Sequence, residues 1–144
     1  MTTLRERALV LLARREHSRA ELARKLAPHD EFGGTDALLD DLQREGLLSD
    51  SRYAEALAHT RAGRHGSLRL KADLRGKGVD DNEAAEALAE ARANDLAAAR
   101  AVWAKKFDSP PSNAAERDKQ MRFLAGRGFP LDVIRRVIGG LEED

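Results

Sequence analysis

Histidines are the first residues whose chemistry could make this chain a metal binder or an acid–base catalyst. The four histidines are scattered, and the nearest pair, His59 and His65, lacks the spacing that places two metal ligands on one face of a helix. His17 and His29 lie still farther apart along the chain. We therefore interpret all four as solvated residues of helices or turns.

Adjacent carboxylates are the next candidates, because paired acids can hold Mg²⁺ or act as acid and base. The adjacent aspartate pairs Asp40–Asp41 and Asp80–Asp81 stand at positions that favour helix starts or solvated faces. The stretches "RGKG" and "GRGF" lack the G-x-x-x-x-G-K-[ST] order of a phosphate-binding loop, and no G-x-S-x-G nucleophile motif occurs. The sequence predicts no enzyme, no cofactor and no metal.

Positive charge is the remaining chemistry, and it is unevenly placed. The chain has 25 Lys and Arg against 25 Asp and Glu, a net charge of zero, whereas a non-specific DNA binder normally shows a basic excess. Residues 59–77 carry six Lys or Arg against one acid, Asp73, while residues 80–90 carry five acids and no base. The neutrality is therefore a cancellation between basic and acidic segments.

The composition indicates which elements must position these charges. Alanine (25 residues) and leucine (20) dominate the apolar residues, while valine and isoleucine together number seven. Alanine and leucine favour helices and branched residues favour strands, so we expect an all-α fold. The chain has no cysteine, no signal-peptide pattern and no long apolar run, which favours a cytoplasmic protein without a membrane segment.

One short pattern, a leucine-bearing basic segment followed by a stop, occurs three times. It reads "ELARKLAPHD", "LKADLRGKGV" and "KQMRFLAGRGF", and its last leucines, Leu26, Leu74 and Leu124, lie 48 and 50 residues apart. A period of this length indicates stacked units that are each too small to bury their apolar face alone. We predict three tandem three-helix repeats, at residues 1–48, 49–93 and 94–144.

In repeat 1, the first helix follows from apolar positions at helical spacing from Leu4 to Leu12. Ser18 and Glu21 form a capping box for the second helix, which ends before Pro28, and Thr35 is the expected cap of the third.

In repeat 2, the first helix begins near Asp50, and the second stops at Gly76 or Gly78, where glycine adopts a left-handed conformation at little cost. Asp80 and Glu83 form a second capping box, and breaks are expected near residues 47–51 and 93–95.

In repeat 3, Trp103 stands at helical spacing with Leu96 and Phe107, which favours a core position over a surface for stacking bases. The last helix begins at Pro130 and Leu131, and Leu141 is expected to face inward.

The predicted second helices are basic and the predicted third helices of repeats 1 and 2 lean acidic, which has two interpretations. Neighbouring helices could pair their charges, or stacking could line the basic helices along one surface that meets an anionic partner. The second interpretation makes the following basic residues the candidate partner-binding site: Arg24, Lys25, Arg61, Arg64, Arg69, Lys71, Arg75, Lys77, Lys119, Arg122 and Arg127.

Four segments in series resemble the RecX family. They are "ARREHSRAELARKL", "GLLSDSRYA", the series Arg61, Gly66, Leu70, Leu74 and Lys77–Gly78, and "RFLAGRGF" followed by Ile134. They span nearly the whole chain in the expected order. The turn before the second helix of repeat 2 departs from the family pattern, which often reads Lys-Gly-aromatic-Gly-Pro; here it reads "GRHGS", residues 63–67.

The resemblance implies an elongated, curved array of the three tandem three-helix repeats. It also implies a non-enzymatic regulator in recombination, DNA repair and the SOS response. Members of the family bind the RecA recombinase filament in its helical groove and usually restrain its ATPase and strand exchange. We therefore expect a cytoplasmic, monomeric protein whose partner is the RecA filament, with direct DNA contact as an open possibility and no cofactor.

The competing hypothesis is a DNA-binding transcription factor with a winged helix-turn-helix at residues 1–48. "SRAELARKL" and "DALLDDLQREGLL" resemble its two helices, but nine residues separate Leu26 from Asp36, more than a turn of three or four. The candidate recognition helix is also acidic, which is unsuited to a phosphate-lined groove. A helical scaffold for some other protein is a third hypothesis.

Overall fold

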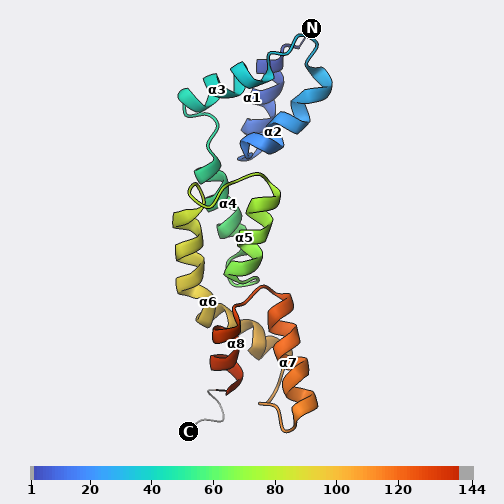
Figure 1. Cartoon of the computed structure of the whole chain (residues 1–144), viewed down its shortest axis with the longest axis vertical. Coiled ribbons are helices and arrows are strands. Elements are labelled where there is room, and N and C mark those ends of the chain that lie inside the picture. The colour runs from blue at the N-terminus through green and yellow to red at the C-terminus, as the bar shows by residue number, and fades with distance from the viewer. Residues whose placement is uncertain (1, 140–144) are drawn as a thin grey trace. The chain divides into compact units, whose positions relative to one another are not determined.

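The computed structural model describes residues 2–139, and every regular element in that stretch is helical (Figure 1). This confirms the all-α prediction; Leu141 and the rest of residues 140–144 lie outside the described residues. The elements in chain order are α1 (Leu4–Arg14), α2 (Arg19–Leu26), the 3₁₀-helix η1 (Ala27–His29), α3 (Thr35–Arg44), α4 (Asp50–Arg61), α5 (Ser67–Gly76), α6 (Ala85–Lys106), α7 (Ala114–Gly126) and α8 (Leu131–Ile138).

The chain divides into two compact units that interleave along the sequence. Unit 1 comprises Met1–Ala56 and Leu74–Ala84, and unit 2 comprises Leu57–Asp73 and Ala85–Asp144. The division passes through α4 and α5, so the predicted repeat 2 contributes to both units. Among the described residues, no helix has the length and apolar character needed to cross a membrane.

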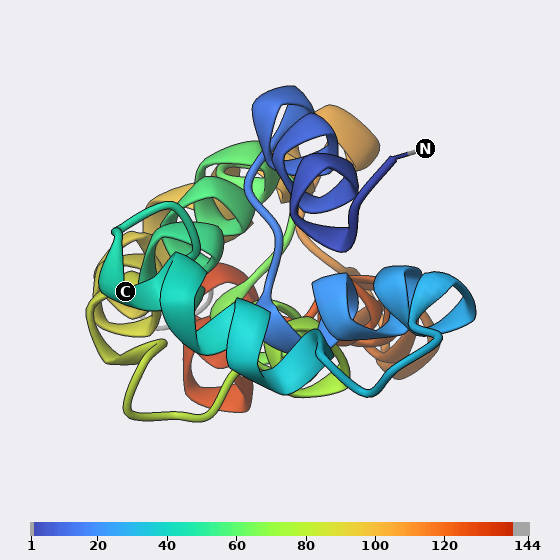
Figure 2. The same cartoon turned by 90° about the horizontal axis from the view of Figure 1, so that it is seen from above.

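Leucine builds the core of unit 1. Leu22 and Leu26 of α2 pack with Leu39 and Leu42 of α3 and with Ala8 of α1, all of them almost fully buried. The view from above shows that α3 crosses α1 rather than running alongside it (Figure 2). The three helices therefore enclose a small core that contains no aromatic ring.

The predicted caps of unit 1 are correct in part. Ser18 accepts a hydrogen bond from the backbone N–H of Glu21 at 3.1 Å, as predicted. The Glu21 carboxylate, however, accepts two hydrogen bonds from Arg15, at 2.6 and 3.1 Å, so the printed contacts of this side chain do not complete the predicted box. Thr35 is the first residue of α3 and not its cap, because Asp30 accepts the N–H of Thr35 and two preceding backbone N–H groups.

Unit 2 has a core drawn from α6, α7 and α8. Ala99 and Val102 of α6 pack against Leu124 of α7 and against Ile134 and Ile138 of α8. Helix α8 packs against both α6 and α7, as Figure 1 shows.

Helix α6 overturns the expected break near residues 93–95. It runs without interruption from Ala85 to Lys106, across the predicted boundary between repeats 2 and 3. The physical reason is local: the segment contains no glycine or proline and is rich in alanine, the strongest helix former. Asp80 does accept the N–H of Glu83 at 2.8 Å, but α6 begins only at Ala85.

The start of α2 meets the end of α5 within unit 1. The Ser18 hydroxyl donates to the carbonyl of Lys77 at 2.7 Å, and Asp50 accepts from the backbone N–H of Arg19 at 2.7 Å. Gly78 has a φ of +79°, and a Cβ there would stand 2.5 Å from a side-chain carbon of α2. We call this contact the unit 1 joint.

The start of α5 is held in a similar way within unit 2, at what we call the unit 2 joint. Asp95 of α6 accepts from the backbone N–H of Ser67 at 2.9 Å and from the Ser67 hydroxyl. Gly128, with a φ of +88°, packs closely against α5, as Gly78 packs against α2. Arg19 and Ser67 lie 48 residues apart, so the two joints repeat at the period that the leucines predicted.

Candidate functional site, a basic cluster in unit 2

The unit 2 joint brings two turns into backbone contact. The N–H of Gly66 donates to the carbonyl of Arg127 at 2.8 Å, and the N–H of Leu68 donates to the carbonyl of Gly128 at 3.0 Å. A Cβ at position 66 would stand 2.4 Å from the Gly128 carbonyl oxygen, so only glycine allows this approach. The α4–α5 turn is thereby fixed against the turn that follows α7.

Four arginines gather around His65 as a result. The positive charges of Arg61, Arg64, Arg69 and Arg127 all act on its ring. Burial lowers the pKa of His65, and the four guanidinium groups lower it further. Its buried Nδ1 has no hydrogen-bond partner among the described residues. We call these four arginines and His65 the unit 2 basic cluster.

Few negative charges balance this cluster. Asp73 of α5 forms an ion pair with Arg61 and lies 4.0 Å from Arg69. Arg64 is exposed and donates to the backbone carbonyl of Thr60 at 2.7 Å. That acceptor is neutral, so the contact does not balance the charge of Arg64. The cluster therefore presents an excess of positive charge.

Aromatic rings adjoin the cluster through Arg127. The Arg127 guanidinium carbon lies 5.1 Å from the centre of the Phe123 ring, and the Lys106 ammonium lies 5.6 Å from the same centre. Phe123 meets Phe107 edge to face at 5.5 Å. Cations stacked on a ring of this kind are held in place by the ring's negative face.

Trp103 lies in the core region, as its helical spacing predicted. It is partly buried against the unit 2 core, and its Nε1 donates to the side-chain oxygen of Gln120 at 2.8 Å. The Trp103 ring centre is 6.4 Å from that of Phe107. This packing favours a structural role.

Two further predicted residues lie on α7 of unit 2. Lys119 and Arg122 are both exposed and three residues apart, so they share one side of the helix. Lys71 of α5 is partly buried.

The other predicted residues lie in unit 1. Arg24 is exposed and has no ion pair with a described residue, while the Lys25 ammonium lies 2.9 Å from His17 Nε2. Arg75 makes two contacts with Asp81, at 2.7 and 3.2 Å, and Lys77 is partly buried. The single basic surface that would join all eleven residues remains a prediction.

Charge pairing between helices, the other interpretation of the sequence, applies at some positions. Arg19 of α2 contacts Asp40 of α3 at 2.7 Å, which pairs a basic second helix with an acidic third helix. Sequence reasoning also overlooked Lys106 and Phe123. The i, i+4 spacing of Phe123 and Arg127 was the available signal.

The arrangement of unit 2 suits binding to an anion. Arginine clusters beside aromatic rings are the features that hold phosphates and stack bases in proteins that bind single strands. In residues 2–139 no group of three histidine or acidic side chains could hold a metal ion.

Comparisons with known proteins identify relatives along almost the whole chain. A family model described as "RecX, second three-helix domain" matches residues 49–88, and one described as "RecX, third three-helix domain" matches residues 93–138. The "Regulatory protein RecX" of Ralstonia nicotianae is 47% identical and covers 97% of this chain and 89% of its own length. That of Chromobacterium violaceum is 46% identical and covers 99% and 93%.

A solved structure has the same fold. The crystal structure of RecX from Lactobacillus salivarius matches with a TM-score of 0.79 at 24% identity and covers 96% of this chain and 94% of that chain.

Proposed function

Because the chain belongs to the RecX family of regulatory proteins, we propose that it acts on the RecA recombinase, binding the RecA–DNA filament and restraining its ATPase and strand exchange without chemistry of its own. The feature of this chain that supports the proposal is the unit 2 basic cluster. The protein would act in the cytoplasm as a monomer.

Electrostatics explain why a filament would be preferred to naked DNA. The chain as a whole is neutral, so long-range attraction to a polyanion is weak. A filament groove presents acidic protein surface together with DNA phosphates, and a local cluster of arginines can contact both. Binding would restrain the ATPase if the protein held one filament state more tightly than another.

The primary experiment is a co-sedimentation assay with three arms: RecA filaments on single-stranded DNA, RecA alone, and the DNA alone. We expect retention by the filament and weak retention by either component. RecA ATPase and strand exchange, titrated with the protein, should fall as the filament is occupied. Tight binding to one duplex sequence with no effect on RecA would favour the transcription-factor hypothesis instead.

Charge reversal in the cluster tests which surface is used. Arg64→Glu and Arg69→Glu together should weaken filament binding roughly tenfold and flatten its salt dependence, since each contact to an anion contributes modestly. The Arg69, Lys71 and Arg75 triple reversal would do the same, but Arg75 also pairs with Asp81. The smaller pair of substitutions is therefore cleaner.

Arg100→Glu is the matched control for Arg64→Glu. Arg100 is exposed on α6 of the same unit, and its reversal changes the net charge equally. Equal weakening by both single variants would mean that total charge, and not the cluster, sets the affinity. Truncation at Asn94 is a poor test, because it cuts within α6 and removes most of the unit 2 core.

A further inference from the structure

We propose that the groove between α1 and α2 in unit 1 is a docking site for an acidic peptide segment that carries apolar residues between its acids. The proposal is independent of the unit 2 basic cluster and of RecA. It rests on the shape of this groove, its lining residues and two arginines, Arg7 and Arg14, that have no ion pair with a described residue, whereas the lining Lys25 lies 4.0 Å from Glu21.

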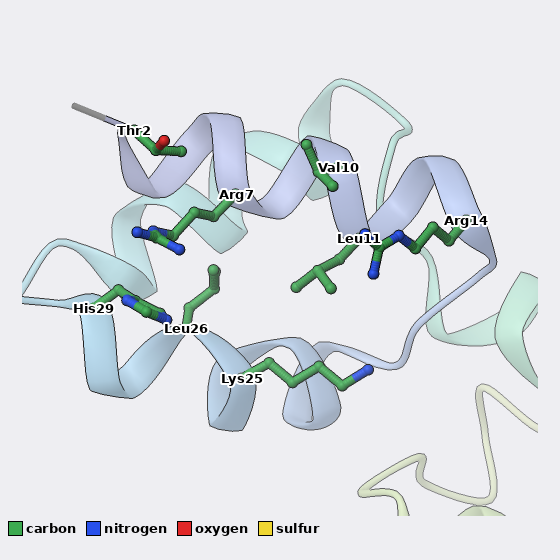
Figure 3. A pocket seen from close by; sticks show the side chains of 8 residues that line it. All are labelled: Thr2, Arg7, Val10, Leu11, Arg14, Lys25, Leu26 and His29. Carbon is green, nitrogen blue, oxygen red and sulfur yellow. The ribbon is translucent and has the colours of Figure 1, made fainter.

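The groove has a volume of about 380 Å³ and an apolar centre between basic ends. Figure 3 shows Leu11 and Leu26 reaching toward each other in the middle of the opening. Arg7 and His29 lie at one end and Arg14 and Lys25 at the other, with the two helices as walls. Val10, which also lines the groove, is 52% exposed and leaves an apolar edge open to solvent. The remaining lining residue is Thr2.

Charge within the groove is all of one sign. None of the eight lining residues is acidic. The other two arginines of residues 4–15 are paired: Arg5 contacts Glu45 at 2.6 Å, and Arg15 contacts Glu21 at 2.6 Å.

Arg7 and Arg14 depart from this rule, because neither has an ion pair with a described residue, although Arg7 is partly buried. A partly buried guanidinium without a carboxylate is a group that an incoming acid would satisfy.

Spacing along α1 defines the pattern that would fit. Arg7 and Arg14 are seven residues apart, which places their backbones about 10 Å apart along a helix. Acids separated by about three residues in an extended peptide span the same distance. Apolar side chains between those acids would lie over Leu11 and Leu26, and their burial would add to the attraction of the charges.

A peptide fits this groove better than a nucleic acid does. Single strands are held by aromatic side chains on which bases stack, and none of the eight lining residues is Phe, Tyr or Trp. The apolar lining residues Val10, Leu11 and Leu26 would gain little from contact with phosphates. The aromatic ring with its two cations belongs to unit 2, so the two units differ in the ligand that their surfaces suit.

Fluorescence anisotropy of a labelled peptide, GDELLDEG, with the full chain tests the proposal. We expect saturable binding that is lost with GNQLLNQG, which lacks the acids, and weakened with GDEGGDEG, which lacks the apolar residues. Arg7→Glu combined with Arg14→Glu should weaken binding at least tenfold. Arg24→Glu is the matched control, because Arg24 is an exposed, unpaired arginine of α2 outside the groove, and it should change binding less than twofold.

Several outcomes would overturn the proposal. They are the absence of saturable binding, an equal loss with Arg24→Glu, and displacement of the peptide by oligothymidine with tighter binding of that oligonucleotide, which would assign the groove to nucleic acid. If the double reversal fails to fold, Arg14→Gln still tests the site, because Arg14 is exposed. RecA co-sedimentation with the same variants separates this proposal from the proposed function.

Discussion

Each unit buries a carboxylate beside the start of a second helix, and the two groups are in opposite electrostatic situations. Glu21 lies in the first turn of α2, whereas Asp95 lies within α6 and bonds the first residue of α5. Among the described residues, Glu21 in unit 1 is 5% exposed and Asp95 in unit 2 is 2% exposed. Burial opposes the charge of Glu21, but the hydrogen bonds and charge of Arg15, with His17 and Lys25, lower its pKa to about 2. Burial raises the pKa of Asp95, and its two bonds from Ser67 offset this only in part.

The difference shows that the hydrogen-bond partner of a buried acid decides whether its charged form is favoured. Glu21 faces a guanidinium, which compensates a charge that has left water. The hydrogen bonds that Asp95 accepts from described residues come from neutral donors, the N–H and hydroxyl of Ser67. Two buried carboxylates near the joints therefore differ: Glu21 is stabilised as an anion in unit 1, and burial disfavours the anion of Asp95 in unit 2.

The joints also differ in how closely they fit. Ser18 reaches across the unit 1 joint with a hydroxyl, whereas the equivalent Gly66 crosses the unit 2 joint with its backbone N–H. A side chain can adjust to a small displacement and a backbone contact cannot. Unit 2 should therefore tolerate change at its joint less well than unit 1.

The largest effect is expected from Gly66→Ala. The new Cβ would stand 2.4–2.7 Å from three backbone atoms of Gly128 and Phe129, which cannot move without breaking the turn-to-turn hydrogen bonds. We expect a loss of more than about 3 kcal/mol in the free energy of unfolding, measured by urea titration. Gly63→Ala is the control: its φ of +77° is strained, but nothing lies within 4 Å, so about 1 kcal/mol is expected. Equal losses would refute the tight fit of the unit 2 joint.

Glu21→Gln should have the next largest effect and should reveal itself through pH. Because the folded pKa is depressed, the contribution of Glu21 is present above its ordinary pKa of 4.5 and is lost as pH falls toward 2. At pH 7 the variant should lose roughly 3 kcal/mol, and the two unfolding curves should converge as pH falls. Glu45→Gln, in the exposed pair with Arg5, should lose much less. A loss that does not change with pH would contradict this account.

Ser18→Ala should cost about 1.5 kcal/mol, since it removes both the cap of α2 and the bond to the Lys77 carbonyl. Ser18→Thr keeps the hydroxyl and should recover part of that stability if the added methyl group can be accommodated. Thermal unfolding of the two variants side by side measures the difference. An unchanged Ser18→Ala midpoint would mean that the unit 1 joint does not depend on this side chain.

Asp95→Asn should have the smallest effect, within about 1 kcal/mol, because an amide can accept from the Ser67 N–H and donate to its hydroxyl. The raised pKa means that the stability contributed by Asp95 is present below 3.8 and is lost as pH rises through its folded value. The variant should therefore gain on the wild type as pH rises through that window, opposite in sign to Glu21→Gln. A relative loss would show that the Asp95 anion is stabilised.

Local chemistry made much of the fold predictable. Alanine and leucine indicated helices, and the glycines after the leucine-bearing segments do adopt the left-handed conformation at Gly78 and Gly128. Ser18 could be identified as a cap from the sequence, because a cap accepts from a backbone N–H only three residues away, here that of Glu21. Such features depend on neighbours in sequence, which a sequence displays directly.

Long-range geometry explains what the sequence did not reveal. The expected break at residues 93–95 came from the repeat period, and α6 continues because no local signal stops it. The burial of Asp95 was not predicted, because its partner Ser67 lies 28 residues away in the sequence. The four arginines around His65 come from both sides of a contact between two turns. These turns are far apart in the sequence, so no local pattern predicts their contact.

The interleaving of the two units has a consequence for how such genes can change. Residues 57–73 belong to unit 2 but stand between the two parts of unit 1, so neither unit is encoded by one continuous stretch of DNA. A gene fragment that ends after codon 56 would encode Ser18 and Asp50 without Lys77 or Gly78, and the unit 1 joint could not form. Exchange of segments between related genes must therefore carry both units together or lose a joint.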